Sequence, residues 1–418
     1  MNILILHRIP YQKIDYHRGI DHDRHDVTYF GTRKILDTLP SWLRCRKVER
    51  PGRSAVYDEA VAWLEREPQH HFDRVLSLSE YELLDAARLR ERLGVPGAPL
   101  EQVTLVRDKV KMKQAVARAG LRVPRFLPLA DFLDAGAEWN GPTVLKPHSG
   151  ASSEDVIVFP TAKQAREAIV SQCSGVPRLD ADIATRDAFE TEEFVTGPVL
   201  HFDGLIARGE VLALTASRYV GTCLGYANGQ PLGSYHFPVT EAARSWVDRA
   251  LDSVGIKDGS FHLEAIESDG ELVFLEVANR VGGADVVATF ELATGIHLPS
   301  QELRILLGED VPALKADVTS TGLWHGWFVV PGHHLGGGAH GGIDGIESFR
   351  NDAAVLRWNE LKTGAPLPGN ITYQAHEVPL AGIIATASAV ETHEWFERLF
   401  AAVRLRRPAD SELPQAVR

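Results

Sequence analysis

Two alternating segments around a tight-turn signal, within residues 259–278, constrain this chain more than any other feature. Ser268-Asp269-Gly270 separates them and is typical of a turn, so the sequence predicts a β-hairpin with a three-residue loop. Successive side chains of a strand point to opposite faces, which places His262, Glu264 and Glu276 on one face. The opposite face is predicted to pack on a core and carries Phe261, Leu263, Ala265, Val273, Leu275 and Val277.

The register of this hairpin predicts that its two carboxylates lie close together. We expect Glu276 opposite His262 and diagonal to Glu264, with the acids roughly 7–8 Å apart. Such a pair is unfavourable unless a positive charge neutralises it, and Mg²⁺ typically binds one or two carboxylates together with substrate phosphates. Two glutamates on a hairpin can equally be solvated side chains. Arg280, which follows the second strand in Arg-Val-Gly-Gly283, favours a site for phosphate or an oxyanion.

Composition and charge argue against several classes of function. A chain of 418 residues predicts two or three domains. The net charge of -12 argues against a nucleic-acid or anionic-membrane partner. No apolar stretch approaches the roughly 20 residues that span a bilayer, and the first apolar run is predicted to be a strand rather than a signal peptide. Cys45, Cys173 and Cys223 show no metal-like spacing, so we expect a reduced, cytoplasmic protein.

The order of strand and helix signals predicts three domains. Residues 1–100 alternate strands with helices, which indicates a parallel α/β sheet. The loop after the first strand lacks a Gly-x-Gly-x-x-Gly sequence, so a dinucleotide-dependent oxidoreductase is not favoured. Residues 101–310 are predicted to hold the central domain, and residues 311–418 a smaller α+β subdomain. The predicted strands include 2–7, 27–30, 74–78, 143–147, 156–159 and 189–195, and the predicted helices include 56–67, 80–93, 107–119, 162–171 and 392–404.

Two segments of the central region are candidate phosphate contacts. Lys146 ends a predicted strand, and the small-residue loop that follows contains Ser152 and Ser153. Such loops offer backbone N–H groups and hydroxyls to phosphate, and a lysine adds a positive charge. Lys109 lies on a helix with several basic residues. Each segment is also typical of ordinary structure, a turn with a surface lysine in one case and a basic helix face in the other.

A strand that turns at Gly197 is a candidate contact for a purine ring. Glu192, Glu193 and Val195 stand at its end, where backbone groups without strand partners can bind the edge of adenine. An ordinary strand-to-turn transition has the same pattern.

Four histidines, at positions 325, 333, 334 and 340, cluster in or near a glycine-rich segment, residues 331–342. Their spacing fits no zinc pattern. A long glycine-rich segment is instead typical of a loop that covers an active site.

In this order and spacing, the segments of residues 100–310 resemble the ATP-grasp superfamily of ADP-forming ligases. Asp108-Lys109 is similar to the start of the family's first helix. Val144-Leu-Lys146-Pro and the loop after it resemble the strand and the small-residue loop that cover the phosphates in the family. Glu192 or Glu193 through Gly197 resembles the adenine-side hinge. The metal-binding acids and the arginine of the family are matched by Glu264, Glu276 and Arg280.

Within that superfamily, the chain resembles the carboxylate–amine ligases, including the L-amino-acid ligases. Their pattern of Gly-x-x-His-x-Glu followed by Glu-x-x-x-Arg-x-x-Gly is matched by His262, Glu264, Glu276, Arg280 and Gly283. His236 with Pro238 resembles a His-x-Pro-like element near the substrate pocket of that group. The chain departs from the pattern at Ala278, where many relatives carry an asparagine, so the number of Mg²⁺ ions stays open.

The resemblance implies an ATP-grasp fold with a preceding Rossmann-like α/β domain and a trailing α+β subdomain. It also implies a ligase that uses ATP and Mg²⁺, or Mn²⁺ in its place, to join a small carboxylate to an amine through an acyl phosphate, with a homodimer as its assembly. Glu264 and Glu276 would bind the metal, Lys109 and Lys146 the phosphates. Arg280 and His262 would be catalytic. Amino acids are the expected substrates.

Two alternatives stay open beside this hypothesis. The first is a ligase that joins an amino acid to a non-amino-acid or carrier-bound acid. The second is a nucleotide-binding module without turnover, which Ala278 and the glycine-poor phosphate loop favour and which Glu264, Glu276 and Arg280 argue against.

Overall fold

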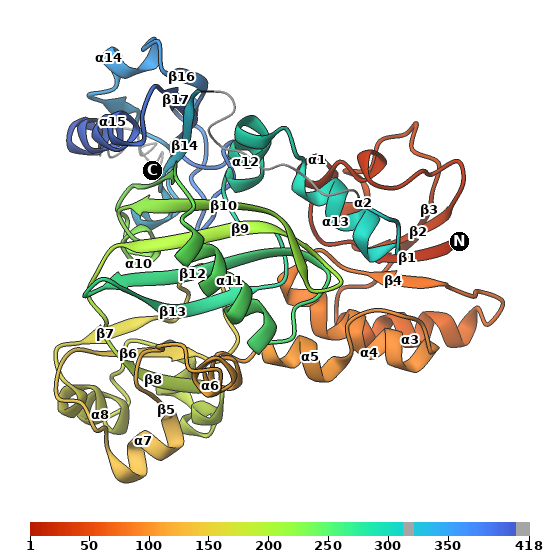
Figure 1. The fold of residues 1–418 in the computed structure, drawn as a ribbon, viewed down its shortest axis with the longest axis horizontal. Coiled ribbons are helices and arrows are strands. Elements are labelled where there is room, and N and C mark those ends of the chain that lie inside the picture. Colours follow the sequence, from red (N-terminus) through yellow and green to blue (C-terminus); the bar gives the residue numbers. More distant parts are fainter. Residues whose placement is uncertain (312–321, 407–418) are drawn as a thin grey trace, which may run out of the picture.

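The structure, a computed structural model, describes residues 1–311 and 322–406. Its main sheets are a four-stranded N-terminal sheet, a small four-stranded sheet and an eight-stranded sheet. The eight-stranded sheet lies in the middle of the molecule, between the N-terminal sheet and the small sheet (Figure 1). None of the helices in these two ranges combines the length and the apolar character needed to cross a membrane.

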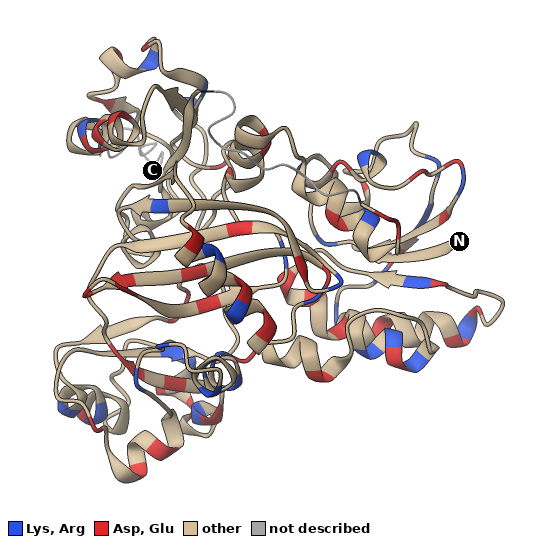
Figure 2. Ribbon diagram, in the orientation of Figure 1, with Lys and Arg blue, Asp and Glu red and all other residues tan. Residues whose placement is uncertain are grey.

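The N-terminal sheet is parallel, as predicted, in the order β3-β2-β1-β4. Its central strands are apolar and buried, whereas the edge strand β3 reads Arg-Lys-Val-Glu, which explains why its sequence gave no strand signal. The helices α3 and α4 cover one face, and both carry charges of both signs on their outer sides (Figure 2). The elements are β1 (Asn2–Leu6), β2 (Asp26–Gly31), β3 (Arg46–Glu49), α3 (Val56–Arg66), β4 (Arg74–Leu76) and α4 (Leu83–Leu93).

The small sheet is antiparallel, in the order β5-β8-β6-β7. An apolar cluster between this sheet and the helices α7 and α8 holds it together. On its other side lies α6, which begins at Lys109, since the Asp108 side chain caps it by accepting hydrogen bonds from Val110 N and Lys111 N. The elements are α6 (Lys109–Arg118), β5 (Phe126–Pro128), α7 (Leu129–Ala135), β6 (Thr143–Pro147), β7 (Ile157–Phe159), α8 (Ala162–Val170) and β8 (Phe189–Glu193).

The eight-stranded sheet is antiparallel, in the order β13-β12-β9-β10-β11-β14-β17-β16. The helices α6 and α11 pack on one face of its first strands, where they bury the largest apolar cluster. The helix α13 packs against β12 and β9 and also contacts the N-terminal sheet. The elements are β9 (Val199–Ala207), β10 (Glu210–Val220), β11 (Leu232–Phe237), α11 (Glu241–Ser253), β12 (Gly259–Ser268), β13 (Glu271–Ala278), α12 (Val286–Thr294) and α13 (Leu298–Leu306).

The C-terminal segment supplies the remaining strands of the same sheet. These are β14 (Trp324–Val330), β16 (Val355–Glu360) and β17 (Leu380–Thr386), and α15 (Ala389–Ala402) packs on them. Strand β14 pairs directly with β11. Part of the predicted C-terminal subdomain, residues 312–321 and 407–418, lies outside the described residues, and the division into three domains stays a prediction.

The acidic hairpin, β12 and β13, has a different register from the predicted one. Ser268 pairs with Glu271, so the loop has two residues, and both have positive φ, as a type I′ turn requires. The prediction that Glu276 lies opposite His262 was wrong: a bulge pairs Glu264 with Glu276 directly and His262 with Ala278. The bulge reverses the alternation, so Phe274 rather than the predicted Leu275 packs in the core.

Candidate active site

A cavity of about 310 Å³ lies between the small sheet and the acidic hairpin. Residues from α6, β6, β8, β12 and β13 line it, together with the loop that follows β6. Nine residues that the sequence singled out meet in this one cavity: Lys109, Lys146, Ser152, Ser153, Glu192, Glu193, Val195, Glu264 and Glu276. Segments spread over some 170 residues of sequence thus form one binding surface.

One end of this cavity is polar. Lys109, the first residue of α6, places its Nζ atom 2.9 Å from Glu276 Oε2 and donates to the carbonyl of Gly150 at 3.1 Å. Burial alone would raise the pKa of Glu276, but attraction to Lys109 and then Lys146 lowers it to about 2. Lys109 therefore ties the phosphate-loop candidate to the acidic hairpin.

Two lysines and two glutamates form a buried network beneath the cavity floor. Lys113 Nζ donates to Glu190 Oε1 at 2.8 Å and to Glu192 Oε2 at 2.6 Å, and Lys146 Nζ donates to Glu192 Oε1 at 2.7 Å. Burial alone would raise the pKa of Glu192, but the two lysines lower it to about 2. Burial alone would also lower the pKa of Lys146, yet Glu192 and Glu190 hold it above its usual value. The network pairs two lysines with two glutamates, so its formal charges balance.

The loop after β6 adopts an unusual backbone at the cavity wall. Ser152 and Ser153 both have positive φ, 61° and 55°, which side chains other than glycine seldom adopt. Strain of this kind often occurs at functional sites. Arg107 Nη2 donates to Ser149 Oγ at 3.0 Å, and Lys109 N donates to His148 O. Arg107 lies just before α6 and Lys109 is its first residue, so the start of this helix holds the loop.

The other end of the cavity is apolar and ends at the turn after β8. Val144, Val158, Ile266 and Leu275 line it beside the backbone of residues 193–197. Gly197 has φ of +155°, and a Cβ atom there would lie 2.1 Å from the carbonyl oxygen of Glu267, so this turn requires glycine. An apolar slot bounded by this turn suits a purine ring.

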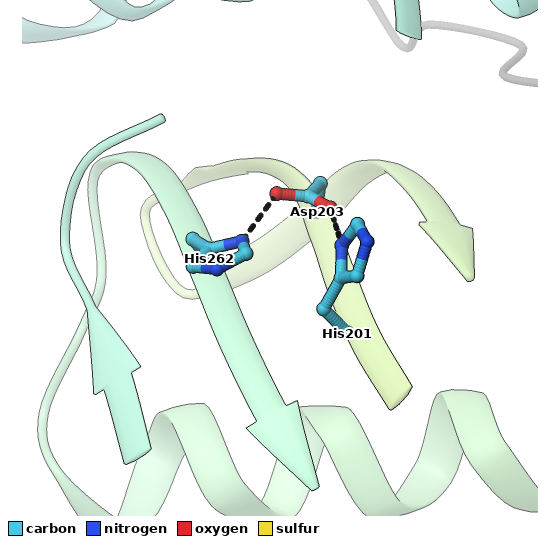
Figure 3. A group of neighbouring side chains, drawn as sticks. All are labelled: His201, Asp203 and His262. Atoms are coloured by element: carbon cyan, nitrogen blue, oxygen red, sulfur yellow. Dashed lines mark hydrogen bonds and ion pairs between the residues drawn. The ribbon is translucent and has the colours of Figure 1, made fainter. Parts of the chain in front are cut away.

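Three buried side chains, His201 and Asp203 of β9 and His262 of β12, form a hydrogen-bonded cluster beside the acids (Figure 3). Asp203 accepts from both histidines, with Oδ1 2.8 Å from His262 Nδ1. Burial alone would lower the pKa of His262, but Asp203 and then Glu264 raise it to about 10. His262 is therefore an imidazolium whose Nε2 lies 3.3 Å from Glu264 Oε1.

A second cavity, of about 130 Å³, adjoins the first. It shares Ser152, Ser153, Glu264 and Glu276 with the first cavity, and adds His262, Arg280 and Gly283. Arg280 Nε donates to Glu80 Oε2 at 2.6 Å, and Arg107 also pairs with Glu80, which belongs to the N-terminal segment. The N-terminal segment therefore holds an arginine of this cavity in place.

The donor atoms at the junction of the two cavities suit a hard divalent cation. Glu264 and Glu276 lie side by side in the bulged hairpin and offer carboxylate oxygens, the ligands that Mg²⁺ and Mn²⁺ prefer. Cys223 lines both cavities, but burial raises the pKa of its thiol well above the usual value, and Nδ1 of His262 is bonded to Asp203. Acidic residues are also visible on β12 and β13 in Figure 2.

No known protein-family profile matches the chain. Among curated proteins, it is 27% identical over 249 residues to the L-arginine-specific L-amino acid ligase of Bacillus subtilis, which covers 57% of this chain and 59% of that enzyme. It is 23% identical over 258 residues to an alanine–anticapsin ligase of Bacillus subtilis, 56% of this chain and 54% of that one. The match thus spans less than two thirds of each relative.

The whole described fold is similar to solved structures. An L-amino acid ligase from Bacillus licheniformis superposes with a TM-score of 0.70 and 21% identity, over 97% of this chain and 98% of that one. An ADP complex of N5-carboxyaminoimidazole ribonucleotide synthetase superposes with a TM-score of 0.64 and 15% identity, over 95% and 96%. The chain has the ATP-grasp fold.

The first and second cavities together are lined by every residue that the sequence singled out for the site except one. His236 lines neither cavity. It is buried on β11, its Nδ1 atom lies 3.0 Å from Ser217 Oγ, and burial lowers its pKa to about 4. The substrate contact of His236 stays a prediction, and its ring lies outside these two cavities.

Sequence reasoning missed several residues that line these cavities or contact their lining residues. Lys113 lay in a segment that looks like a basic helix face, and Glu80 is distant in sequence. His201 and Asp203, two apart on one strand, share a face with His262 of the paired strand, a signal that alternation alone could have revealed.

Asn279, the asparagine next to Ala278, and the histidines at 325–340 line neither cavity. Asn279 donates to the carbonyls of Ser260 and Asp258, so it points away from the acids. In residues 1–311 and 322–406, the one group of three or more His, Cys, Asp or Glu side chains close enough to hold a metal ion is His201, Asp203 and His262, so the histidines of 325–340 form no such group.

Proposed function

We propose that this ATP-grasp protein is an ATP-dependent carboxylate–amine ligase that forms an amide bond between amino acids and releases ADP and phosphate. The L-amino acid ligases that it resembles in sequence and in fold support this proposal. One observation carries it: Glu264, Glu276, Ser152 and Ser153 line both cavities. A phosphate donor in the first cavity and a carboxylate in the second would therefore meet between the two acids and the phosphate loop.

The reaction follows from the chemistry of the carboxylate, which is a poor electrophile. Transfer of the ATP γ-phosphoryl group to a carboxylate oxygen gives an acyl phosphate and ADP. An amine then attacks the acyl carbon, and the carbon–oxygen bond to phosphate breaks as the amide forms and the amine loses a proton. Phosphoryl transfer depends mainly on positioning and charge neutralisation.

The chain's own residues have distinct roles in this proposal. Glu264 and Glu276 hold Mg²⁺, which neutralises phosphate charge when bound. Lys109 and Lys146 bind phosphate oxygens, and the turn at residues 193–195 binds the adenine. Arg280 stabilises the charge on the acyl phosphate and on the oxyanion of the addition step. His262, as a protonated imidazolium, donates to Glu264 and fixes its orientation.

Release of ADP and phosphate tests the proposal. Purified protein with Mg-ATP is incubated with amino acids, singly and in pairs, and products are identified by mass spectrometry. One pair is expected to stimulate release and to form a new amide, and Arg280→Ala to lower turnover by about 100-fold or more while ATP still binds. Arg122→Ala, at an exposed arginine outside both cavities, is the matched control and is expected to retain full activity.

Other outcomes point to the alternatives. ATP binding without ADP release under any condition favours a nucleotide-binding module, and release only with non-amino-acid or carrier-bound acids favours the other ligase class. We further expect a homodimer, which sedimentation or light scattering tests, and a cytoplasmic location, which fractionation tests.

A further inference from the structure

The lining of the second cavity has two chemically different parts. The polar part is the junction with the phosphate loop and the two acids. The other part is formed by uncharged and mostly aromatic or aliphatic side chains, and this set consists of Tyr219, Cys223, Leu232, Ala284, Trp327 and Tyr373. We call these six residues the apolar wall. None of them has a role in the phosphoryl-transfer steps above.

Packing fixes the apolar wall in place. Trp327 of β14 is almost fully buried and meets Tyr219 edge to face, with ring centroids 6.2 Å apart. Tyr219 in turn donates to Glu264 Oε1 at 2.8 Å. Tyr373 stacks on Tyr226 with centroids 4.5 Å apart, and Tyr226 donates to the carbonyl of Thr372. The aromatic rings are therefore held rigidly relative to the acid that faces the phosphates.

The charges of the second cavity are already paired. Arg280 bonds Glu80, Glu276 bonds Lys109, and Glu264 accepts from Tyr219. All of these charges lie among the polar lining residues, and the apolar wall contributes no charged group. A charged substrate side chain directed at the wall would have to lose its hydration without gaining a partner there, which is strongly unfavourable. An apolar side chain would instead gain burial.

The size of the cavity limits the side chain that fits. Its volume is about 130 Å³. An apolar protein cavity of about 150 Å³ holds one benzene molecule. Because part of this space must hold the carboxylate, the wall accommodates a side chain no larger than a branched aliphatic group. The indole of Trp327 is the largest side chain of the wall and takes up space that a larger substrate group would need.

We propose that this cavity binds an amino acid with an uncharged aliphatic side chain, up to about the size of leucine, and presents its carboxylate for phosphorylation, with Trp327 as the residue that sets the size limit. The proposal rests on the proposed ligase function and specifies its carboxylate substrate. Relatives specific for other amino acids need not share it, since it depends on this chain's own wall residues.

Hydroxylamine allows a test that needs no knowledge of the natural amine. It attacks an acyl phosphate and yields a hydroxamate, which is measured directly. With Mg-ATP and hydroxylamine, alanine, valine, leucine and methionine are expected to exceed arginine, lysine, aspartate and glutamate by about 100-fold or more in kcat/KM. Calorimetric binding of the same amino acids, in the presence of a non-hydrolysable ATP analogue and Mg²⁺, gives a second readout that does not require turnover.

Trp327→Ala tests the size limit. It is expected to raise the ratio of kcat/KM for phenylalanine over alanine by about 10-fold or more. Trp324→Ala is the matched control, because Trp324 lies on the same strand but lines neither cavity, and the ratio should stay within about twofold of wild type. Trp327→Phe keeps an aromatic packing partner for Tyr219 and serves if the alanine variant fails to fold; it should shift the ratio in the same direction.

Each outcome separates this inference from the proposed function. Preferred use of arginine, lysine, aspartate or glutamate overturns the inference and leaves the ligase function standing. Binding of aliphatic amino acids without any hydroxamate supports the cavity assignment and overturns the ligase function. A size ratio that does not move in either Trp327 variant refutes the role of that residue. If no amino acid binds or reacts, both proposals fall.

Discussion

Lys113→Met is the most informative single change in the buried network of two lysines and two glutamates at the first cavity. Methionine keeps most of the length and volume of the lysine side chain but removes its charge. The wild-type network has two ammonium groups and two carboxylates, and Lys113 and Glu190 are fully buried. After the change, Glu190 and Glu192 share only Lys146, so one negative charge stays buried without a partner.

The expected loss in free energy of unfolding follows from that imbalance. Deleting one partner of a buried ion pair costs about 3–5 kcal/mol. The ammonium of Lys113 also lies 4.6 Å from the ring centre of Phe126, a contact whose loss adds about 0.5–1 kcal/mol. Lys146 Nζ lies 3.9 Å from Glu190 Oε1 and offsets part of the cost. We therefore expect a loss of about 3–4 kcal/mol at neutral pH, which is large against a typical total of about 5–15 kcal/mol.

Urea unfolding followed by circular dichroism measures this loss, with a constant m-value as the sign that the unfolded state is unchanged. The double variant Lys113→Met/Glu190→Gln restores charge balance and should recover about 1–2 kcal/mol. Lys111→Met, on the exposed side of the same helix, should cost under about 0.5 kcal/mol. A single-variant loss below about 1 kcal/mol, or a double variant no more stable than the single one, would refute the reasoning.

Three further predictions concern acid stability, the cluster of His201, Asp203 and His262, and the turn at Gly197. Since the pKa of Glu192 is depressed from 4.5 to about 2 in the folded state, its contribution is present above pH 4.5 and is lost as pH falls from about 4.5 to about 2; thermal melts across that range should show the decline. Asp203→Asn should lower turnover by about 10–100-fold with little change in ATP affinity, and equal losses in both would contradict a positioning role. Gly197→Ala should lower the melting temperature more than Gly209→Ala, because both glycines have positive φ but only the first is crowded; equal effects would remove the steric explanation.

Local sequence patterns predicted the elements well because strands and helices are encoded over short distances. Strand β6 was predicted to the residue, and the N-terminal sheet was predicted as parallel from alternation of strands and helices. The acidic hairpin was predicted as a hairpin, yet its bulge was not. Phe274 and Leu275 are both apolar, so nothing in the pattern tells which of them leaves the core.

Contacts between distant segments account for what the sequence could not reveal. Glu80 and Arg280 are 200 residues apart, and no periodicity links them. The same holds for Lys113 and its two glutamates, since the helix pattern shows that a face is basic but not that the face is buried. The spacing around His236 does not determine to which side of the sheet its ring points, and the ring lines neither cavity.

The eight-stranded sheet also limits how proteins of this architecture can exchange parts. Trp327 of β14 pairs in register with Ser234 of β11, and the Ser234 hydroxyl bonds His201, which shares Asp203 with His262. A recombination breakpoint between β11 and β14 would leave β11 as an exposed edge with unpaired backbone groups, a known route to aggregation. We therefore expect the apolar wall and the acid pair Glu264 and Glu276 to tolerate point substitutions better than exchange of the C-terminal segment.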